Sequence, residues 1–249
     1  MKKAGRSSFV ETVLTVFYAV LIAIVIRTVL FEPFNIPSGS MRPTLEVGDY
    51  LFVSKYSYGY SRFSLPLGLD LFEGRVMEQP VTRGDVVVFR KPGDTSTDYI
   101  KRIVGLPGDR IRMVDGVLII NDVAVPRERI EDYIETLPNG GMRRIEQYRE
   151  TLPGGVTYIT FNEITGGTAD NTGVYEVPPG HYFAMGDNRD NSMDSRIKPE
   201  LGGVGFVPAQ NLVGRARIIF FSTDGSAGLF EPWNWFGAIR YGRLLQVIR

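Results

Sequence analysis

Residues 83–109, which read RGDVVVFRKPGDTSTDYIKRIVGLPGD, decide the fold class of this chain. They contain two apolar runs, at 86–90 and 99–104, joined by a turn at Pro92-Gly93. Runs rich in β-branched residues and bounded by glycine and proline are typical of paired strands. Similar runs recur at 50–53, 117–120, 158–161, 181–185 and 212–221. The sequence therefore predicts a mainly β protein with an antiparallel β core.

An apolar run near the start of the chain predicts a transmembrane helix. Residues 9–31 read FVETVLTVFYAVLIAIVIRTVLF, and residues 12–26 within them carry no charge. At a rise of about 1.5 Å per residue, about 20 helical residues cross a hydrocarbon core of about 30 Å. A cleaved signal peptide is the alternative, but the run ends without a small-x-small cleavage site. We therefore expect one permanent anchor.

Charge at the two ends of the chain predicts how it meets the membrane. Lys2, Lys3 and Arg6 stand in residues 1–8 without an acidic residue, so the positive-inside rule keeps this tail in the cytoplasm. Residues 32–249 then form an extracytoplasmic domain of a bacterial inner-membrane protein. A C-terminal aromatic and basic segment is either a second contact with lipid or part of the core: Phe230, Trp233, Trp235, Phe236, Arg240 and Arg243.

Composition excludes several classes of function. The 249 residues include 28 basic and 28 acidic side chains, so the chain is not a polycation suited to nucleic acid. It has no cysteine and one histidine, His181. Thiol nucleophiles, disulfide frameworks and zinc clusters are excluded, and a Ser-His-Asp triad has only one imidazole to use. We expect no cofactor, no bound metal and no nucleic-acid partner.

The middle of the chain differs in composition from the β-rich runs around it. Residues from about 114 to 178 are more polar, and glutamate and arginine concentrate between 126 and 150. We found no internal repeat. The shift in composition predicts a β-rich subdomain inserted into the β core.

Two serines directly follow the predicted anchor, in the segment PSGSMRPTL at residues 37–45. The glycine between Ser38 and Ser40 allows backbone conformations closed to other residues, so that a hydroxyl and a free N–H can face one point. An ordinary Ser-Gly-Ser linker between anchor and domain fits this segment as well. The residues alone do not distinguish Ser38 from Ser40 as a nucleophile.

A serine nucleophile needs a base, and Lys101 is the best candidate. In the strand at 99–104, side chains alternate between faces, so one of the two cations Lys101 and Arg102 should face inward. Burial lowers the pKa of an amine, whereas a guanidinium does not lose its proton in proteins. Of the chain's six lysines, only Lys101 lies in an apolar strand; Lys55, for example, is in a polar setting. Two solvated strand charges are the alternative.

A third polar segment, GDNRDNSMDSR at 186–196, follows an apolar run. Its carboxylate spacing is close to that of a calcium loop, but it lacks the glycine and the glutamate that an EF-hand needs at its sixth and twelfth positions. An ionic network of Asp194 with Arg196 is the better account. The hydroxyls of Ser192 and Ser195 are then free to orient a neighbour.

Taken together, these segments resemble the type I signal peptidases, the membrane-anchored Ser/Lys endopeptidases with which bacteria remove signal peptides from exported proteins. The matching segments occur in the family's order and cover most of the predicted β core: PSGSMRPTL at 37–45, GDYLFVSKYSYG at 48–59, RGDVVVFRKP at 83–92, DYIKRIVGLPGD at 98–109, GDNRDNSMDSR at 186–196 and VPAQNLVGRA at 207–216. Residues 114–178 and the C-terminal segment have no counterpart that we can carry over.

The resemblance implies roles for particular residues. It places the nucleophile at Ser40 and the general base at Lys101, with the Ser40 N–H and the Ser38 hydroxyl as oxyanion donors. Ser192 would orient the lysine amine, and Asp194 with Arg196 would support the site. The resemblance also implies cleavage after small residues in an Ala-x-Ala-like pattern, in a pocket lined by Phe34, Ile36, Pro37, Met41, Leu45, Tyr99 and Ile100.

The implied partners are preprotein signal peptides, the lipid bilayer and, as a candidate, the protein-export machinery. Two other readings stay open. A self-cleaving repressor-type protease shares a Ser/Lys dyad, but it should carry a DNA-binding helical domain in place of the apolar helix. A non-catalytic anchored β-domain would need neither Ser40 nor Lys101.

Overall fold

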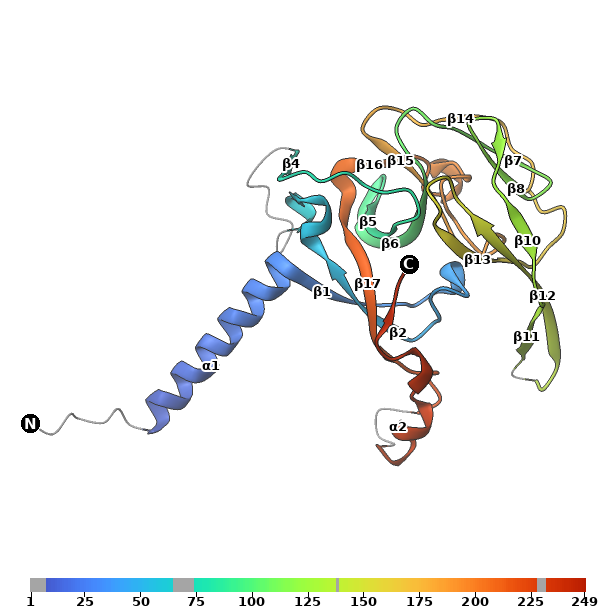
Figure 1. Ribbon diagram of the computed structural model, residues 1–249. Helices are drawn as coiled ribbons and strands as arrows, with labels where there is room; N and C mark the ends of the chain where they lie inside the picture. The colour runs from blue at the N-terminus through green and yellow to red at the C-terminus, as the bar shows by residue number, and fades with distance from the viewer. Residues whose placement is uncertain (1–7, 65–73, 138, 228–231) are drawn as a thin grey trace, which may run out of the picture.

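The chain is built from one long N-terminal helix and a β domain, as the computed structural model shows for residues 8–64, 74–137, 139–227 and 232–249 (Figure 1). Helix α1 (Ser8–Val25) runs on into a π-helical segment, Ile26–Leu30. Together they form 23 residues, of which an 18-residue stretch has a mean hydropathy of 2.5, and none of their side chains is buried in the protein. The predicted N-terminal apolar helix is thus confirmed, although Phe31, which the prediction of 9–31 included, begins β1; by length and composition the helix can cross a bilayer.

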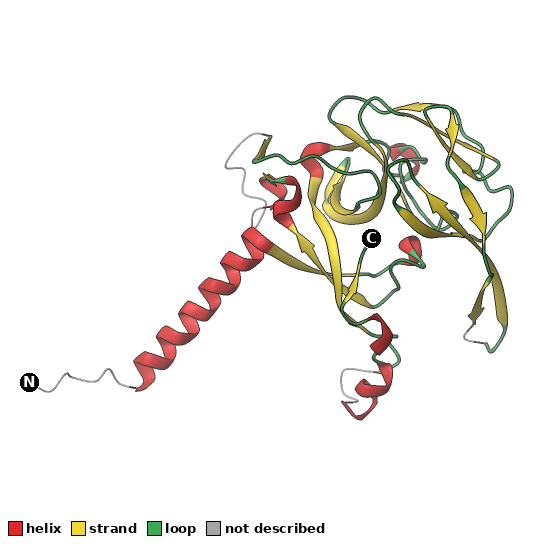
Figure 2. Cartoon of the chain, in the orientation of Figure 1, coloured by secondary structure: helices red, strands yellow, loops and turns green. Residues whose placement is uncertain are grey.

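Strands dominate the rest of the chain, and the few other helices are short (Figure 2). The described strands are β1 (Phe31–Asn35), β2 (Asp49–Ser54), β3 (Tyr60–Ser61), β4 (Arg75–Val76), β5 (Val86–Lys91), β6 (Asp94–Gly105), β7 (Arg110–Val114), β8 (Val117–Ile120), β9 (Val123–Ala124), β10 (Arg127–Arg129), β11 (Tyr133–Thr136), β12 (Met142–Thr151), β13 (Thr157–Asn162), β14 (Tyr175–Glu176), β15 (His181–Met185), β16 (Val207–Pro208), β17 (Leu212–Ser222) and β18 (Gln246–Val247). The described helices after the anchor are α2 (Pro232–Ala238) and 3-10 turns at Gly39–Met41, Lys55–Tyr58, Arg62–Ser64, Pro199–Leu201, Ala209–Asn211 and Tyr241–Arg243.

The main sheet has eight strands, and its named strand pairs are antiparallel. Its order is β1-β2-β17-β5-β6-β15-β16, with β18 paired to β17. All seven apolar runs identified in the sequence are strands in the structure, and the two runs of residues 83–109 form the β5–β6 hairpin. The prediction of a mainly β, antiparallel core is confirmed.

The segment between β6 and β15 leaves the main sheet and returns to it. Strands β6 and β15 are neighbours in that sheet, although about 75 residues separate them along the chain. Strands β7 to β14 form two further four-stranded sheets, β10-β12-β11 with β13, and β14-β7-β8-β9. This is the arrangement that an insertion produces, and the boundaries of 114–178 stay a prediction.

Apolar side chains cover both faces of the main sheet. Val86 and Val88 of β5 belong to one buried cluster, while Val87 and Phe89 belong to another. Successive side chains of a strand point to opposite faces, so alternation between two apolar clusters means that the strand is buried on both sides. In the inner part of the neighbouring strand β6, the consecutive cations Lys101 and Arg102 are both buried, although they point to opposite faces.

Polar caps join the end of the anchor to the domain. Lys55 donates to Glu32 at 2.9 Å and to the carbonyl oxygen of Arg27 at 3.4 Å. The Tyr60 hydroxyl donates to the carbonyl oxygen of Val29 at 2.8 Å. These contacts satisfy carbonyls that the last turn of a helix leaves without intrahelical donors. The sequence predicted a polar setting for Lys55. Lys55 does pair with Glu32, but its side chain is buried, which the sequence did not indicate.

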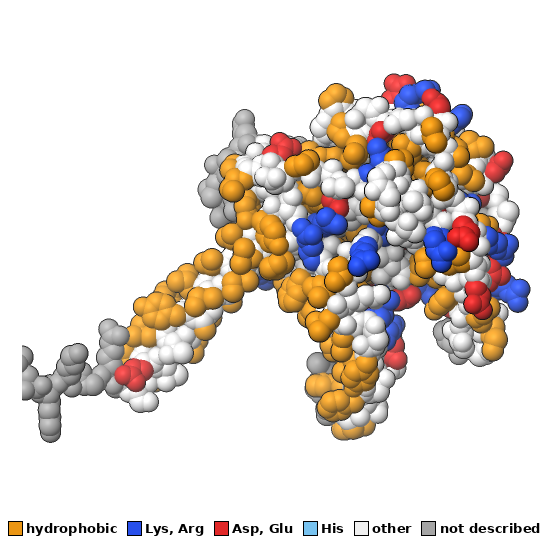
Figure 3. Space-filling model, viewed as in Figure 1, with side chains coloured by type: hydrophobic (Ala, Val, Ile, Leu, Met, Phe, Trp, Pro, Cys, Tyr) orange, Lys and Arg blue, Asp and Glu red, His pale blue; other side chains and the backbone are white. Residues whose placement is uncertain are grey.

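The C-terminal segment, for which lipid contact and core packing were both open, is partly exposed and partly bound to the domain. Trp233 and Phe236 of α2 are exposed, and apolar surface covers both α1 and the projection that holds α2 (Figure 3). However, Arg243 binds the buried carboxylate of Asp49, and Arg240 donates to the Val47 carbonyl oxygen at 2.8 Å. The two arginines thus bind the segment to the domain. Phe230 lies outside the described residues.

Candidate active site

Ser40 and Lys101 meet at the centre of the domain. Lys101 Nζ and Ser40 Oγ are 2.7 Å apart, and Nζ also donates to the Ile100 carbonyl oxygen at 2.9 Å. Ser40 lies in the 3-10 turn Gly39–Met41, and Lys101 lies in β6. The structure thus brings together two of the residues that the sequence singled out, from positions 61 residues apart.

Burial changes the pKa of the Lys101 amine. The side chain is 3% exposed because β6 is covered on both faces, and this burial lowers the pKa of Lys101 to about 8. The carboxylates of Asp194 and Asp187 pull the pKa back up, but desolvation outweighs them. An amine with such a pKa is partly neutral near pH 8 and can accept the proton of a hydroxyl at hydrogen-bond distance.

Ser38 lies beside Ser40 and is more exposed. The two Oγ atoms are 3.4 Å apart. Ser38 takes the N-cap position of the turn that contains Ser40 and has extended backbone angles. A hydroxyl and the N–H groups at the start of such a turn can converge on one oxygen of a bound ligand.

Asp194 and Arg196 form the predicted ionic pair. Arg196 donates to both Asp194 oxygens at 2.9 Å, and the Gly186 N–H donates to Oδ2 at 2.9 Å. Burial opposes ionisation of the Asp194 carboxyl, but Arg196 and the backbone donors outweigh burial and lower its pKa. Among the residues that the structure describes, no group of three His, Asp or Glu side chains is arranged to hold a metal ion.

Ser192 does not make the hydrogen bond that the family resemblance implied. Lys101 Nζ bonds Ser40 and Ile100, while the sheltered Ser192 hydroxyl has no protein partner. Ser192 lies against Gly186, on the same side as the Ser40 carbonyl oxygen. It is therefore near the dyad, and its orienting role stays a prediction.

Arg102 and Asp187 form a second buried pair that sequence reasoning missed. Arg102 Nε and Nη2 donate to the two Asp187 oxygens at 2.8 and 2.7 Å, and both side chains are at most 1% exposed. Asp187 also accepts from the Thr44 hydroxyl at 2.5 Å. The pair thus links β6, the loop after β15 and the loop after Ser40. Alternation had indicated one inward cation, but the structure buries both.

An open pocket of about 360 Å³ lies in front of the dyad. One wall is the outer part of β6, and the opposite wall is the loop that follows β15. Its lining residues are Pro37, Ser38, Ser40, Thr97, Asp98, Tyr99, Ile100, Lys101, Asn191 and Met193. Asn191 and Met193 belong to the loop after β15 and are exposed, and sequence reasoning did not identify either of them.

Three of the seven expected pocket residues line this pocket: Pro37, Tyr99 and Ile100. The expectation for the others needs correction. Ile36, Met41 and Leu45 are at most 3% exposed in a core cluster, and Phe34 packs against the same cluster. Apolar residues next to a reactive serine serve equally well as core or as pocket wall, and here they support the serine from behind.

Comparison with known proteins agrees with this geometry. Residues 9–221 match the family described as signal peptidase, peptidase S26. Signal peptidase I of Rickettsia typhi is 45% identical over 92% of this chain and 90% of its own length, and that of Rickettsia prowazekii is 44% identical over the same shares. A crystal structure of a signal peptidase I from Enterococcus faecalis aligns at a TM-score of 0.34 and 24% identity, covering 55% of this chain and 97% of that one. From the family match and the Rickettsia relatives, the chain belongs to the signal peptidase family, peptidase S26.

Proposed function

We propose that this chain is a membrane-anchored serine endopeptidase that removes N-terminal signal peptides from exported preproteins, with Ser40 as nucleophile and Lys101 as general base. The contact of 2.7 Å between a buried amine and a hydroxyl carries the proposal. The family match and the signal peptidase I relatives support the substrate class.

The first half of the reaction forms an acyl-enzyme. Neutral Lys101 takes the proton of Ser40 as Oγ attacks the scissile carbonyl carbon. The negative charge that develops on the carbonyl oxygen is met by the Ser40 N–H and the Ser38 hydroxyl. Protonated Lys101 then gives its proton to the leaving amine, the C–N bond breaks, and the mature protein departs.

The second half regenerates the enzyme. Lys101, neutral again, takes a proton from a water molecule that attacks the ester of Ser40. The ester C–O bond breaks, the proton returns to Oγ, and the signal peptide leaves with a new carboxylate. The low pKa of Lys101 serves both halves, because the amine must be neutral at the start of each.

The outer part of β6 offers a place for an extended substrate. Within the described residues, β15 pairs with β6 only at Arg102, Ile103 and Gly105, whereas β5 pairs with β6 from Asp94 onward. The free edge of β6 thus faces the pocket near Ser40. An extended peptide can add to such an edge by main-chain hydrogen bonds. We propose that the cleavage site binds there and is cut after a small-x-small sequence.

Membrane attachment fits the same proposal. The anchor ends at Leu30, and β1 enters the domain directly, so Ser40 follows closely after the helix. Substrates whose own apolar segment lies in the bilayer then present their cleavage site near the pocket in front of Ser40 and Lys101. We propose a bacterial inner-membrane location with the N-terminus in the cytoplasm. Lys2, Lys3 and Arg6, on which that orientation depends, lie outside the described residues.

A cleavage assay tests the proposed function. Purified full-length chain in detergent should cut a preprotein after its small-x-small site, whereas Ser40→Ala and Lys101→Met should each abolish cleavage and leave the circular dichroism spectrum unchanged. Ser38→Ala should lower kcat by about 100- to 1,000-fold, the usual effect of losing one oxyanion donor. Full activity of Ser40→Ala would reject Ser40 as the nucleophile, whereas absence of cleavage by the wild-type chain would favour the non-catalytic β-domain.

Orientation needs its own experiment. Protease added outside spheroplasts should digest the large domain, and a cytoplasmic marker protein should stay intact as the control. If the domain is protected until the membrane is broken, the proposed orientation is reversed.

A further inference from the structure

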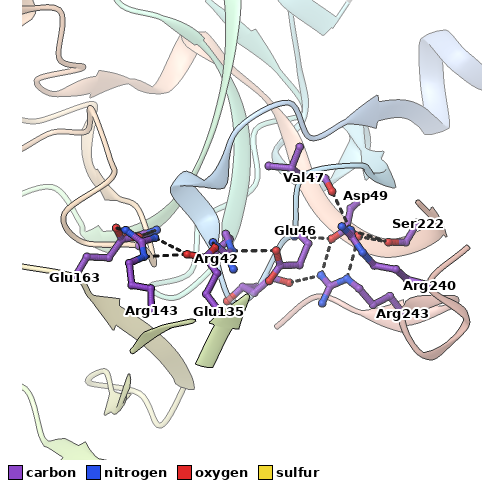
Figure 4. A network of polar contacts seen from close by, with 12 residues as sticks. Arg42, Glu46, Val47, Asp49, Glu135, Arg143, Glu163, Ser222, Arg240 and Arg243 are labelled. Carbon is purple, nitrogen blue, oxygen red and sulfur yellow. Dashed lines mark hydrogen bonds and ion pairs between the residues drawn. The ribbon is translucent and has the colours of Figure 1, made fainter. Parts of the chain in front are cut away.

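A hairpin of the predicted insert contacts the loop of the candidate nucleophile through Arg42. Strands β11 and β12 form this hairpin (Figure 1). Arg42 Nη1 donates to Glu135 Oε1 of β11 at 2.6 Å, and Arg42 Nε forms an ion pair with Glu46 at 3.0 Å (Figure 4). Arg42 thus joins two acidic groups, one from the hairpin and one from the loop after Ser40.

Aromatic rings hold the same guanidinium. Its carbon lies 5.4 Å from the ring centre of Tyr133 and 5.5 Å from that of Phe161. Tyr133 belongs to β11 and Phe161 to β13, and the centres of the two rings are 5.1 Å apart. A guanidinium over an aromatic face gains electrostatic attraction as well as contact area. Arg42 is therefore held by charge and by packing, from two strands of the insert.

The network beyond Glu135 returns to Ser40. Glu135 accepts from Arg143 Nη2 at 2.7 Å, and Arg143 Nη1 donates to Glu163 at 3.0 Å (Figure 4). Glu163 accepts from the Asn188 side chain at 2.8 Å, and the Asn188 N–H donates to the carbonyl oxygen of Ser40 at 3.1 Å. The insert thus contacts the loop of the nucleophile directly at Arg42, and it reaches Ser40 indirectly through Asn188 of the loop after β15.

We propose that Arg42 is a positioning residue, through which the β11–β12 hairpin sets the place of Ser40 Oγ relative to Lys101 Nζ. This inference rests on the proposed function of the dyad. Lys101 is fixed within a strand buried on both faces, so the separation of the two atoms depends on the loop of Ser40. The contacts of Arg42 hold this loop on the side of the insert, while Met41 and Leu45 hold it from the core.

A matched ion pair of the insert supplies the control. The pair of Arg149 with Glu128 has the same chemistry at 2.9 Å, and it joins β12 to β10. Its side chains are 48% and 68% exposed, compared with 14% and 19% for Arg42 and Glu135. Among the described residues, the hydrogen bonds and ion pairs of these two side chains do not include the loop of Ser40. Replacing it changes the charge of the insert without changing the support of the nucleophile.

The experiment compares full-length variants in detergent with a signal-peptide substrate, at a temperature well below the unfolding midpoint of each. Arg42→Met should lower kcat by about 10- to 100-fold with KM unchanged, because small misplacement of a reacting group has effects of this size. Arg42→Lys should recover part of kcat, since it keeps one ion pair. Arg149→Met should match the wild type.

Glu135→Gln provides the second test, and it disturbs folding less than loss of the arginine. Glu135→Gln should also lower kcat. Because both changes remove the same contact, the double variant with Arg42→Met should be no slower than Arg42→Met alone. Additive effects, or an Arg42→Met kcat equal to that of Arg149→Met, would overturn the inference. If Ser40→Ala also cleaves, the proposed function fails instead, so the two failures are distinguishable.

Discussion

Lys101 and Arg102 are consecutive residues of β6, and the main sheet buries both cations on its opposite faces. Their exposed fractions are 3% and 0%. Arg102 keeps its charge because Asp187 neutralises it across two hydrogen bonds. Within the part of the chain that the structure describes, no carboxylate forms an ion pair with the Lys101 amine, and burial lowers the pKa of that amine. One strand thus contains a structural cation and a titrating amine side by side.

Activity should rise with pH through the pKa of Lys101. The protonated amine cannot accept the proton of Ser40, so kcat/KM should increase tenfold per pH unit below about 8 and level off above it. Initial rates on a signal-peptide substrate between pH 5 and pH 10 measure this profile. A rate that is flat across that range would contradict the role of Lys101 as base.

Lys101→Met should stabilise the fold near neutral pH. The pKa of Lys101 is about 8 in the folded protein against 10.5 for the ordinary side chain, so below pH 8 the folded state is destabilised by about 3 kcal/mol through the buried charge. This penalty decreases as the pH rises from 8 to 10.5, where the unfolded chain also loses the proton. Thermal unfolding at pH 7 should therefore show a higher midpoint for Lys101→Met, and the difference should shrink at pH 10. A lower midpoint at pH 7 would argue that Lys101 supports the fold.

Asp187→Asn should be strongly destabilising. It leaves Arg102 buried without a counterion, and breaking a buried pair in this way costs about 3 to 5 kcal/mol. Asp122→Asn is the control, because the pair of Asp122 with Arg110 is 57% and 49% exposed and such pairs contribute about 0 to 1 kcal/mol. Unfolding midpoints of the two variants provide the comparison. Equal midpoints would mean that Arg102 finds another partner.

Gly186→Ala should abolish cleavage while leaving most of the domain folded. A methyl group at Gly186 would lie 2.5 Å from the carbonyl oxygen of Ser40 and would collide with the Ser192 hydroxyl. The backbone of Ser40 must then move, so kcat should fall by at least about 100-fold. Gly173→Ala is the control, since no atom lies within 4 Å of the added methyl group. Normal cleavage by Gly186→Ala would show that the site tolerates such movement.

Tryptophan fluorescence should report whether α2 contacts lipid. The chain has two tryptophans, Trp233 and Trp235, and both lie in α2 with 73% and 46% of their surface exposed. In vesicles made with brominated lipid, emission of the full-length protein should be quenched relative to unbrominated vesicles, because indole rings prefer the membrane interface. Unchanged emission would place α2 away from the bilayer.

Local pattern was enough to predict the strands and to find Lys101. The period of two in residues 99–104 and the turn before it reflect contacts between near neighbours, which a single sequence contains. Local sequence pattern did not distinguish Ser38 from Ser40 as the nucleophile. The choice of Ser40 came from the family resemblance, and the structure places Ser40 within 2.7 Å of the Lys101 amine and leaves Ser38 exposed.

Contacts between distant segments were beyond the reach of pattern. Arg102 and Asp187 are 85 residues apart, and Arg42 and Glu135 are 93 residues apart. In the sequence, Arg42, Glu135 and Asp187 are ordinary charges in polar stretches, and Arg102 is one of two cations in an apolar strand. Only the folded chain shows which charged groups pair. Composition predicted an insert around residues 114–178, but it did not indicate that the insert would reach the loop of Ser40.

The hydrogen bonds of Lys55 and Tyr60 to the end of the N-terminal helix also determine how the bilayer can affect the position of the domain. Since these contacts fix the helix to the domain, a change in helix tilt turns the domain with it. The helix of 23 residues is longer than a bilayer core of about 30 Å requires, so in a chain that spans the membrane it would tilt more in a thin bilayer than in a thick one. In a chain inserted as proposed, bilayer thickness would set the height of the pocket above the headgroups, and with it the distance from a preprotein's apolar segment at which the peptide bond is cut.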